Sequence, residues 1–190
     1  MRVFVALEIP DKIRQAIAGL IGKLEPTCRG ARWVRVEGLH VTLKFIGEVP
    51  PEMVERIGAE LATIRLAAPV EMSFREVGFF PHERHPRVFW VGIAGTPHLG
   101  ELAAEIEGRL EPLGIPRESR PFQPHLTLAR FKSEEGLDRL RGALRSAGPF
   151  EFGSVRTGEL HLYRSQLKPG GAEYTRLKTF AFAPSAGGTG

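Results

Sequence analysis

The chain has 190 residues, of which 42% are hydrophobic and 25% charged, and its net charge is +4 at pH 7. This composition is typical of a soluble globular protein, and the single cysteine, Cys28, excludes an intramolecular disulfide. No apolar run approaches the roughly 20 residues that span a bilayer, and the N-terminus lacks a signal-peptide pattern. We therefore expect a cytoplasmic protein without membrane contact, whose basic charge suits an anionic partner such as nucleic acid.

Alternation of apolar and polar residues predicts strands, and apolar residues three or four apart predict helices. In chain order the sequence predicts a strand at 2–9, a helix at 11–24, a strand at 40–47, a helix at 51–66 and strands at 70–80 and 87–94. There follow a predicted helix at 98–112, a strand at 122–131, a helix at 134–146 and strands at 150–163 and 173–182. The glycine-rich segment 184–190 is expected to be a flexible tail.

The predicted elements repeat along the chain at an offset of about 85 residues. His40-Val-Thr-Leu43 recurs as His125-Leu-Thr-Leu128, and Val3-Phe4 recurs as Val88-Phe89. This order predicts an α+β fold with two pseudo-symmetric lobes, each an antiparallel sheet with helices on its outside, which face each other across a central cleft. Residues 1–183 would form one bilobal domain built by internal duplication. Chance alignment of short elements is the alternative, which several matches in the same order disfavour.

Each repeat places a histidine and a threonine on one face of a strand. Residues i and i+2 of a strand share a face, so His40 lies with Thr42 and His125 lies with Thr127. A neutral imidazole can accept a proton while an imidazolium donates one, and hydroxyl groups can bind phosphate oxygens. The pair in register therefore predicts phosphodiester chemistry without a metal or other cofactor. For either motif alone, a structural histidine beside a strand threonine is the better interpretation.

The two motifs resemble those of the two-histidine phosphoesterase superfamily. The segments around the motifs resemble, more narrowly, those of the RNA 2',3'-cyclic phosphodiesterases, historically called 2'-5' RNA ligases. These segments are residues 33–34, 39–49, 78–81, 87–91 and 124–130. The resemblance implies hydrolysis of RNA 2',3'-cyclic phosphate ends to 2'-phosphate ends, with small cyclic nucleotides as further substrates. We expect a monomer without an obligatory protein partner.

The resemblance also implies a role for each motif residue. His40 would be the general acid that protonates the departing ribose O3', and His125 would be the general base that activates water. Thr42 and Thr127 would hold phosphate oxygens.

Phe45 and Arg130 extend the two motifs, and the resemblance implies that they contact the nucleobase and the phosphate respectively. Both lie five residues after their histidine, an odd spacing that regular alternation places on the opposite face. Spacing alone therefore predicts a core position for Phe45 and a solvated surface position for Arg130. A bulge, a bend or the strand end must turn both side chains if the implied roles hold.

Other residues and other functions remain open at this stage. His82 and His85 are three residues apart, which is not the spacing of a helical zinc motif, and we interpret them as a surface loop. We expect His161 to face solvent and Phe79 and Phe80 to pack in the core, although either kind of side chain can contact RNA. The alternatives to hydrolysis are 2'-5' ligation at the same histidines and a non-catalytic RNA- or nucleotide-binding module.

Overall fold

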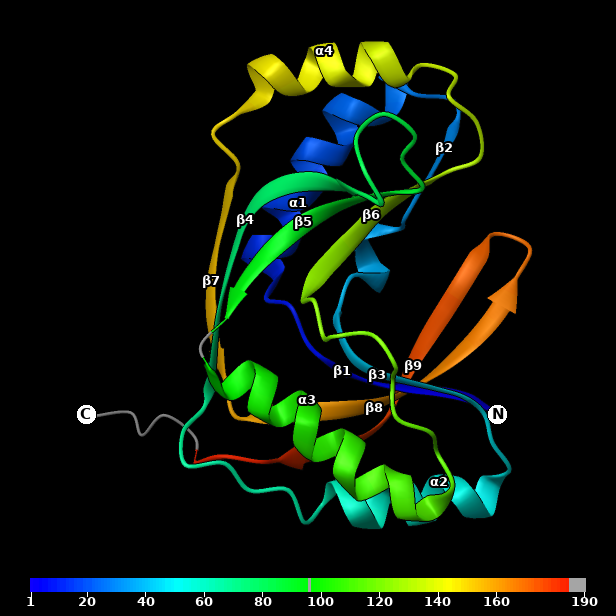
Figure 1. The fold of residues 1–190 in the computed structure, drawn as a ribbon, viewed down its shortest axis with the longest axis vertical. Coiled ribbons are helices and arrows are strands. Elements are labelled where there is room, and N and C mark those ends of the chain that lie inside the picture. Colours follow the sequence, from blue (N-terminus) through cyan, green and yellow to red (C-terminus); the bar gives the residue numbers. More distant parts are fainter. Residues whose placement is uncertain (96, 185–190) are drawn as a thin grey trace.

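The protein contains two antiparallel sheets, described here from a computed structural model that covers residues 1–95 and 97–184 (Figure 1). The four-stranded sheet has the order β3-β1-β8-β9, from β3 (Val41–Glu48), β1 (Arg2–Leu7), β8 (Glu159–Lys168) and β9 (Gly171–Ala181). The five-stranded sheet has the order β2-β6-β5-β4-β7, from β2 (Ala31–Trp33), β6 (His125–Phe131), β5 (Val88–Gly95), β4 (Val70–Phe80) and β7 (Glu151–Thr157).

Helices lie on the outside of both sheets, which confirms the predicted α+β fold with two lobes (Figure 1). The helix α1 (Asp11–Leu24) contacts β7 and α4 (Leu137–Ala147), beside the five-stranded sheet. The helix α3 (Pro97–Leu110) contacts β3 and α2 (Pro51–Leu61), beside the four-stranded sheet. Three short 3-10 helices, Glu25–Thr27, Val36–Gly38 and Glu111–Leu113, connect these elements.

The two lobes are not the two halves of the chain. The strands β8 and β9 return from the second half to join β1 and β3, and β4 of the first half lies in the sheet of β5 and β6. The predicted single strand at 150–163 is wrong, because Gly158 separates β7 and β8 and the chain changes sheet there. A Cβ at Gly158 would lie 2.9 Å from the Ala183 carbonyl oxygen, so this crossing requires a residue without a side chain. The internal duplication stays a prediction.

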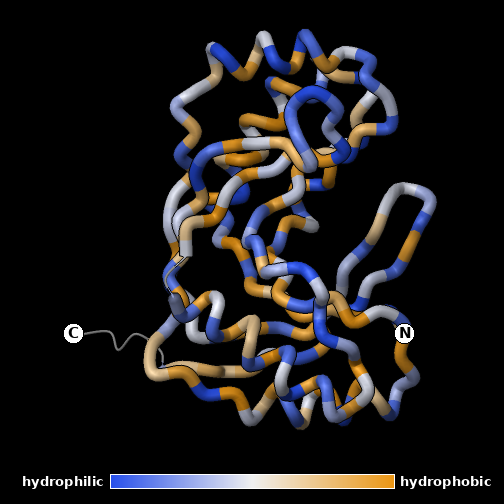
Figure 2. The backbone as a smooth tube through the Cα atoms, viewed as in Figure 1, coloured by the Kyte–Doolittle hydropathy of each residue, from blue (hydrophilic) through white to orange (hydrophobic). Residues whose placement is uncertain are grey.

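The apolar residues of strands and helices form one continuous core that joins the lobes. In α1, for example, the predicted apolar stripe is buried, and it consists of Ile13, Ile17, Leu20, Ile21 and Leu24. Figure 2 shows the corresponding alternation of hydrophobic and hydrophilic positions along the helices. The shared core fixes the two sheets relative to each other, and with them the two histidine motifs.

Three further sequence-based predictions remain untested by this fold: the flexible tail, the cytoplasmic location and the monomeric state. Residues 185–190 of the expected tail lie outside the described residues. Within the described part of the chain, no helix is both long and apolar enough to cross a membrane. The cytoplasmic location and the monomeric state stay predictions.

Candidate active site

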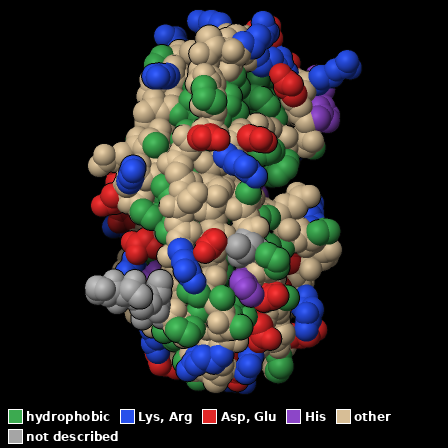
Figure 3. Space-filling model, turned by 90° about the vertical axis from the view of Figure 1, so that its left-hand side faces the viewer, with side chains coloured by type: hydrophobic (Ala, Val, Ile, Leu, Met, Phe, Trp, Pro, Cys, Tyr) green, Lys and Arg blue, Asp and Glu red, His purple; other side chains and the backbone are tan. Residues whose placement is uncertain are grey.

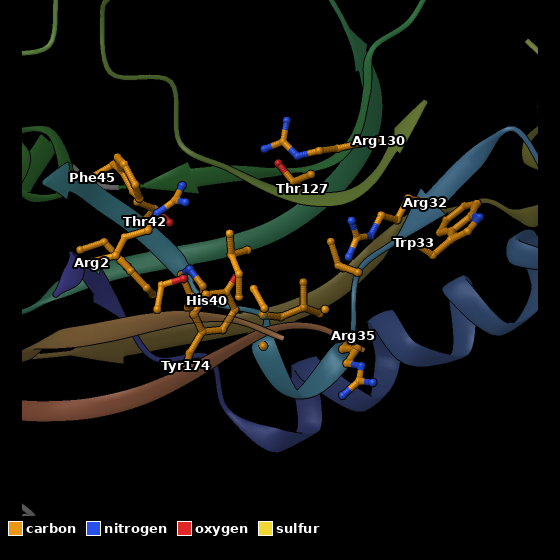
Figure 4. Close-up of a pocket in the computed structure, with 18 of the residues that line it drawn as sticks. Arg2, Arg32, Trp33, Arg35, His40, Thr42, Phe45, Thr127, Arg130 and Tyr174 are labelled. Atoms are coloured by element: carbon orange, nitrogen blue, oxygen red, sulfur yellow. The ribbon is translucent and has the colours of Figure 1, made fainter. Parts of the chain in front are cut away.

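The two histidine motifs face one cavity of about 670 Å³ between the lobes. Figure 4 shows Thr127 and Arg130 reaching into this space from β6, opposite His40 and Thr42 on the β3 side. All six residues singled out in the two motifs line the cavity, and they are His40, Thr42, Phe45, His125, Thr127 and Arg130. The fold therefore brings together groups that are about 85 residues apart in the sequence.

A β-bulge in β6 turns Arg130 towards the cavity. Thr127 and Ala129 pair with consecutive residues of β5, so Leu128 is an extra residue without a partner on that strand. Leu128 and Ala129 are accordingly both buried, one after the other. The extra residue shifts the alternation by one, and Arg130 lies on the same face as Thr127 despite its odd distance from the histidine.

An equivalent bulge in β3 turns Phe45. Thr42 and Lys44 pair with consecutive residues of β1, which leaves Leu43 as the extra residue. Phe45 is 51% exposed and lines the cavity, so the core position predicted from spacing alone is wrong. The bulge has the same place, three residues after the histidine, in both motifs.

His40 is held among aromatic rings at the base of the cavity. Its ring stacks on Phe4 with 4.6 Å between centroids and meets the edge of Tyr174 at 4.9 Å. Burial lowers the pKa of His40 from 6.5 to about 4, because the site disfavours the charged imidazolium; the Gly38 backbone opposes this shift and the Arg14 charge adds to it. His40 is therefore neutral at pH 7 in the free protein.

A nearby backbone carbonyl group orients the ring of His125. Its Nδ1 lies 2.7 Å from the Gln123 carbonyl oxygen, and its ring meets the edge of Phe80 at 5.1 Å. A carbonyl oxygen only accepts, so Nδ1 carries the hydrogen and donates it. This leaves Nε2 of His125 as the nitrogen that can exchange a proton with a substrate.

Comparison with known proteins places the chain in a family. The sequence model of the 2'-5' RNA ligase superfamily matches residues 4–169. The chain belongs to this superfamily. Two relatives named RNA 2',3'-cyclic phosphodiesterase are those of Methanocaldococcus jannaschii, 32% identical over 94% of this chain and 99% of the relative, and of Thermus thermophilus, 37% identical over 95% of this chain and 90% of the relative.

Two solved structures have the same fold as this chain. The E. coli LigT crystal structure complexed with 3'-AMP covers 95% of this chain and 97% of its own, at 30% identity and a TM-score of 0.77. A crystal structure from Thermus thermophilus covers 96% of this chain and 98% of its own, at 33% identity and a TM-score of 0.78.

One residue of the site region was missed by the sequence analysis. Lys44, the residue after the β3 bulge, is only 6% exposed. Its Nζ lies 2.7 Å from a Glu107 carboxylate oxygen on α3 and 2.6 Å from the Pro116 carbonyl oxygen. The same Glu107 oxygen accepts a hydrogen bond from the Glu118 backbone at 3.2 Å. A lysine in an alternating strand is usually a surface residue, so only the bulge explains its burial.

The histidines outside the motifs differ in burial. His82 and His85 lie in an exposed loop, where His85 Nδ1 is 2.6 Å from a Glu134 oxygen, which confirms the predicted surface position. His161 is 3% exposed with Nδ1 2.9 Å from the Thr179 hydroxyl, so its predicted solvent-facing position is wrong. Burial lowers the pKa of His161, and its neighbours Leu160 and Leu162 are also buried, so both faces of β8 are covered here.

The two phenylalanines of β4 have different surroundings. Phe79 packs against the core, 5.1 Å from the ring of Phe89, as predicted. Phe80 is half-buried outside the core cluster, beside His125 and Trp90, so its predicted core position is wrong. Within the described residues no three His, Cys, Asp or Glu side chains are placed to hold a metal ion.

Proposed function

We propose that the protein hydrolyses RNA 2',3'-cyclic phosphate ends to 2'-phosphate ends by acid–base catalysis at His40 and His125. The observation that carries this proposal is the shared cavity, in which two imidazoles meet two threonine hydroxyls and the Arg130 guanidinium. The relatives named RNA 2',3'-cyclic phosphodiesterase support the substrate, and LigT complexed with 3'-AMP supports a nucleotide ligand.

In the proposed reaction His125 Nε2 takes a proton from water while the water oxygen attacks phosphorus. The bond from phosphorus to the ribose O3' breaks, and protonated His40 gives its proton to that oxygen. The phosphate stays on O2'. Thr42, Thr127 and Arg130 donate hydrogen bonds to the phosphate oxygens as negative charge builds on them. No step uses a metal ion.

The burial of His40 sets a condition on this assignment. With a pKa of about 4 in the free protein, His40 is protonated in roughly one molecule in a thousand at pH 7. A bound phosphate places negative charge beside the imidazole and raises its pKa, so the substrate itself prepares the acid. The opposite assignment, with neutral His40 as base and His125 as acid, requires no such shift.

Two other functions use the same cavity. In 2'-5' ligation an RNA 5'-hydroxyl replaces water, and the name of the superfamily records this reaction. A non-catalytic RNA- or nucleotide-binding module needs no matched acid and base, so the paired histidines disfavour it.

The deciding experiment follows one RNA that ends in a 2',3'-cyclic phosphate. Purified protein is incubated with it in excess chelator, with and without a second RNA bearing a 5'-hydroxyl, and the 2'-phosphate, the 3'-phosphate and the joined strand are resolved. We expect the 2'-phosphate at an undiminished rate, and a joined strand as main product would favour ligation. A rate lost in chelator and restored by a divalent ion would contradict the mechanism, and no turnover at all would favour the binding module.

The proposed partners are RNA with a cyclic phosphate end and small cyclic nucleotides.

A further inference from the structure

One end of the cavity has no role in the reaction proposed above. Arg32 of β2 and Arg35, two residues beyond that strand, line this end. Figure 4 shows them on the side of the cavity away from Phe45 and Arg2, with His40 and Thr127 in between. The turn of the β8–β9 hairpin, Gly170 and Gly171, lines the same end.

The positive charge at this end is not balanced by protein carboxylates. In the ladder between β2 and β6, Arg32 lies directly opposite Arg130, so their side chains emerge on the same face. Like charges in this position destabilise a sheet. Among the described residues no carboxylate oxygen lies within 4.0 Å of a guanidinium nitrogen of Arg32, Arg35 or Arg130.

Part of the outer surface differs from the cavity in this respect. Figure 3 shows basic and acidic side chains side by side on the face that it presents. Several surface arginines have such partners, including Arg117 with Glu111 at 2.7 Å and Arg176 with Glu8 at 2.7 Å. In the cavity, Arg32, Arg35 and Arg130 converge on one space without a protein carboxylate among the described residues that line it, which is the arrangement that an anionic ligand completes.

The hairpin turn approaches the two arginines closely. A Cβ at Gly170 would lie 2.7 Å from Arg35 Nη2, and a Cβ at Gly171 would lie 3.7 Å from Arg32 Nη2. Gly171 has a φ of +119°, a conformation that side chains rarely adopt. Glycine at these positions lets the backbone of the turn pack against the guanidinium groups and limits their positions at the cavity wall.

We propose that Arg32 and Arg35 form a second phosphate subsite, which binds an RNA phosphodiester other than the one being cleaved. This inference rests on the proposed function, in which Arg130 contacts the terminal cyclic phosphate. Guanidinium groups bind phosphate with two parallel hydrogen bonds, and a cyclic mononucleotide has no second phosphate to offer. The subsite therefore favours a polynucleotide over a mononucleotide. The phosphodiester belongs either to the strand that carries the cyclic end or to a second strand.

Kinetics with two substrates test the subsite. A cyclic-phosphate-ended oligonucleotide is compared with a 2',3'-cyclic mononucleotide, in the wild type and in Arg32→Ala, Arg35→Ala and Arg29→Ala. Arg29 is exposed and lines no part of the cavity, so its variant controls for net charge. We expect the wild type to have a KM about tenfold lower for the oligonucleotide, a preference that each cavity variant loses and Arg29→Ala keeps. Arg35→Ala should change kcat/KM for the mononucleotide by less than about twofold, since that substrate does not reach the subsite.

Salt dependence and a second strand sharpen the result. Each lost phosphate contact should reduce the slope of log KM against log salt for the oligonucleotide by about 0.7. An RNA without a cyclic end that binds the wild type more tightly than Arg35→Ala, and equally well in saturating cyclic mononucleotide, would assign the subsite to a second strand. Arg35-dependent binding that the mononucleotide abolishes assigns it to the same strand, whose end occupies the active site.

Equal KM values for both substrates in the wild type, or a preference that survives both cavity variants, would overturn the subsite while leaving the hydrolase intact. If neither substrate is turned over, the proposed function fails, and the binding of a 3'-phosphate-ended oligonucleotide then decides the subsite. Equal affinity of the wild type and Arg35→Ala in that measurement would overturn it, and weaker binding by Arg35→Ala would support it.

Discussion

The strands β3 and β6 carry the same motif and the same bulge, yet they occupy different positions in their sheets. Among the described strands, β3 is an edge strand next to β1 alone, whereas β6 lies between β2 and β5. At the position after the bulge β6 has Ala129, which is fully buried, and β3 has Lys44, which pairs with Glu107 of α3. The ion pair with α3 thus holds the edge strand in position, whereas a second neighbouring strand holds the interior strand.

The two histidines also have different surroundings, although their motifs are the same. His40 stacks on Phe4 and lies beside Tyr174, and burial there disfavours its charged form. His125 is tied to the Gln123 carbonyl oxygen by one hydrogen bond. One motif therefore yields two different acid–base sites, because neighbouring strands supply different surroundings to identical residue types. This difference is what an enzyme needs if one histidine gives a proton while the other takes one.

The largest effect is expected from removing either histidine. His40→Ala and His125→Ala should each reduce the hydrolysis rate by about 10²–10⁴, the usual range for one acid–base group. The double variant should lose less than the product of the single losses, because both groups act in one transition state. The measurement is single-turnover cleavage of a cyclic-phosphate-ended RNA. Full activity of both single variants would end the catalytic interpretation.

An activated substrate separates the roles of the two histidines. An aryl phosphodiester has a leaving oxygen that needs no protonation, so it should restore the rate of His40→Ala but not of His125→Ala. Restoration of His125→Ala instead would exchange the roles and make the neutral, buried His40 the base.

The next largest effect concerns the ion pair that distinguishes β3 from β6. Lys44→Met leaves the Glu107 carboxylate without its partner and should reduce the free energy of unfolding by about 3–5 kcal/mol, as measured by urea denaturation. Adding Glu107→Gln removes the unpaired charge and keeps an acceptor for the Glu118 backbone, so it should recover most of that loss. If the double variant is no more stable than Lys44→Met, the lost stability reflects packing and not the uncompensated charge.

The pairing of each histidine with its threonine follows from the sequence, because residues i and i+2 of a strand lie on the same face. The repeat of the motif then predicts that the two pairs face one cleft. The positions of Phe45 and Arg130 do not follow, because their odd spacing conflicts with alternation until Leu43 and Leu128 are recognised as bulge residues. In β6 the bulge places two apolar residues, Leu128 and Ala129, in succession, which is a local signal, whereas in β3 the second residue is Lys44 and the sequence shows none. Resemblance to the family pointed to the right face where periodicity pointed to the wrong one.

The arrangement of the strands in the two sheets could not be predicted from periodicity, for another reason. The change of sheet at Gly158 and the short strand β2 depend on which strands become neighbours, which local patterns do not encode. His161 alternates like a surface residue, yet it is buried with its Nδ1 beside the Thr179 hydroxyl of the neighbouring strand β9. Elements that depend on local spacing were therefore predictable, and those that depend on the order of strands in a sheet were not.

Stability should fall in acid because His40 is held neutral. Between pH 6.5 and about 4 the unfolded chain binds a proton at this histidine that the folded protein does not, so the free energy of unfolding decreases as the pH falls through this window. The loss is about 3 kcal/mol and is complete below pH 4. His40→Gln should flatten this part of the stability profile, and His161→Gln should flatten it further, because burial lowers the pKa of His161 too. An unchanged slope in His40→Gln would show that its pKa is ordinary.

The pH dependence of the rate should show how bound substrate changes the pKa of His40. The profile of kcat/KM reports pKa values of the free protein, so one limb should lie near pH 4, whereas the profile of kcat reports the complex. If His40 is the acid, that limb should move up by about one to two pH units in kcat, because the bound phosphate stabilises the imidazolium. A limb that stays near pH 4 in both profiles would favour His40 as the base.

The smallest effect concerns the fifth position after each histidine, where β3 has Phe45 and β6 has Arg130. Arg130→Lys keeps the charge but loses the planar fork that binds two phosphate oxygens, so the rate should fall about tenfold, and Arg130→Ala should fall further. Protein stability provides a second measurement. Arg32 lies opposite Arg130 in the ladder, so Arg130→Ala also relieves a like-charge repulsion and should slightly stabilise the protein without ligand. A variant that is more stable and less active is the result expected of a residue kept for its ligand. Near-normal rates for both variants would make Arg130 a surface charge that the bulge happens to turn inward.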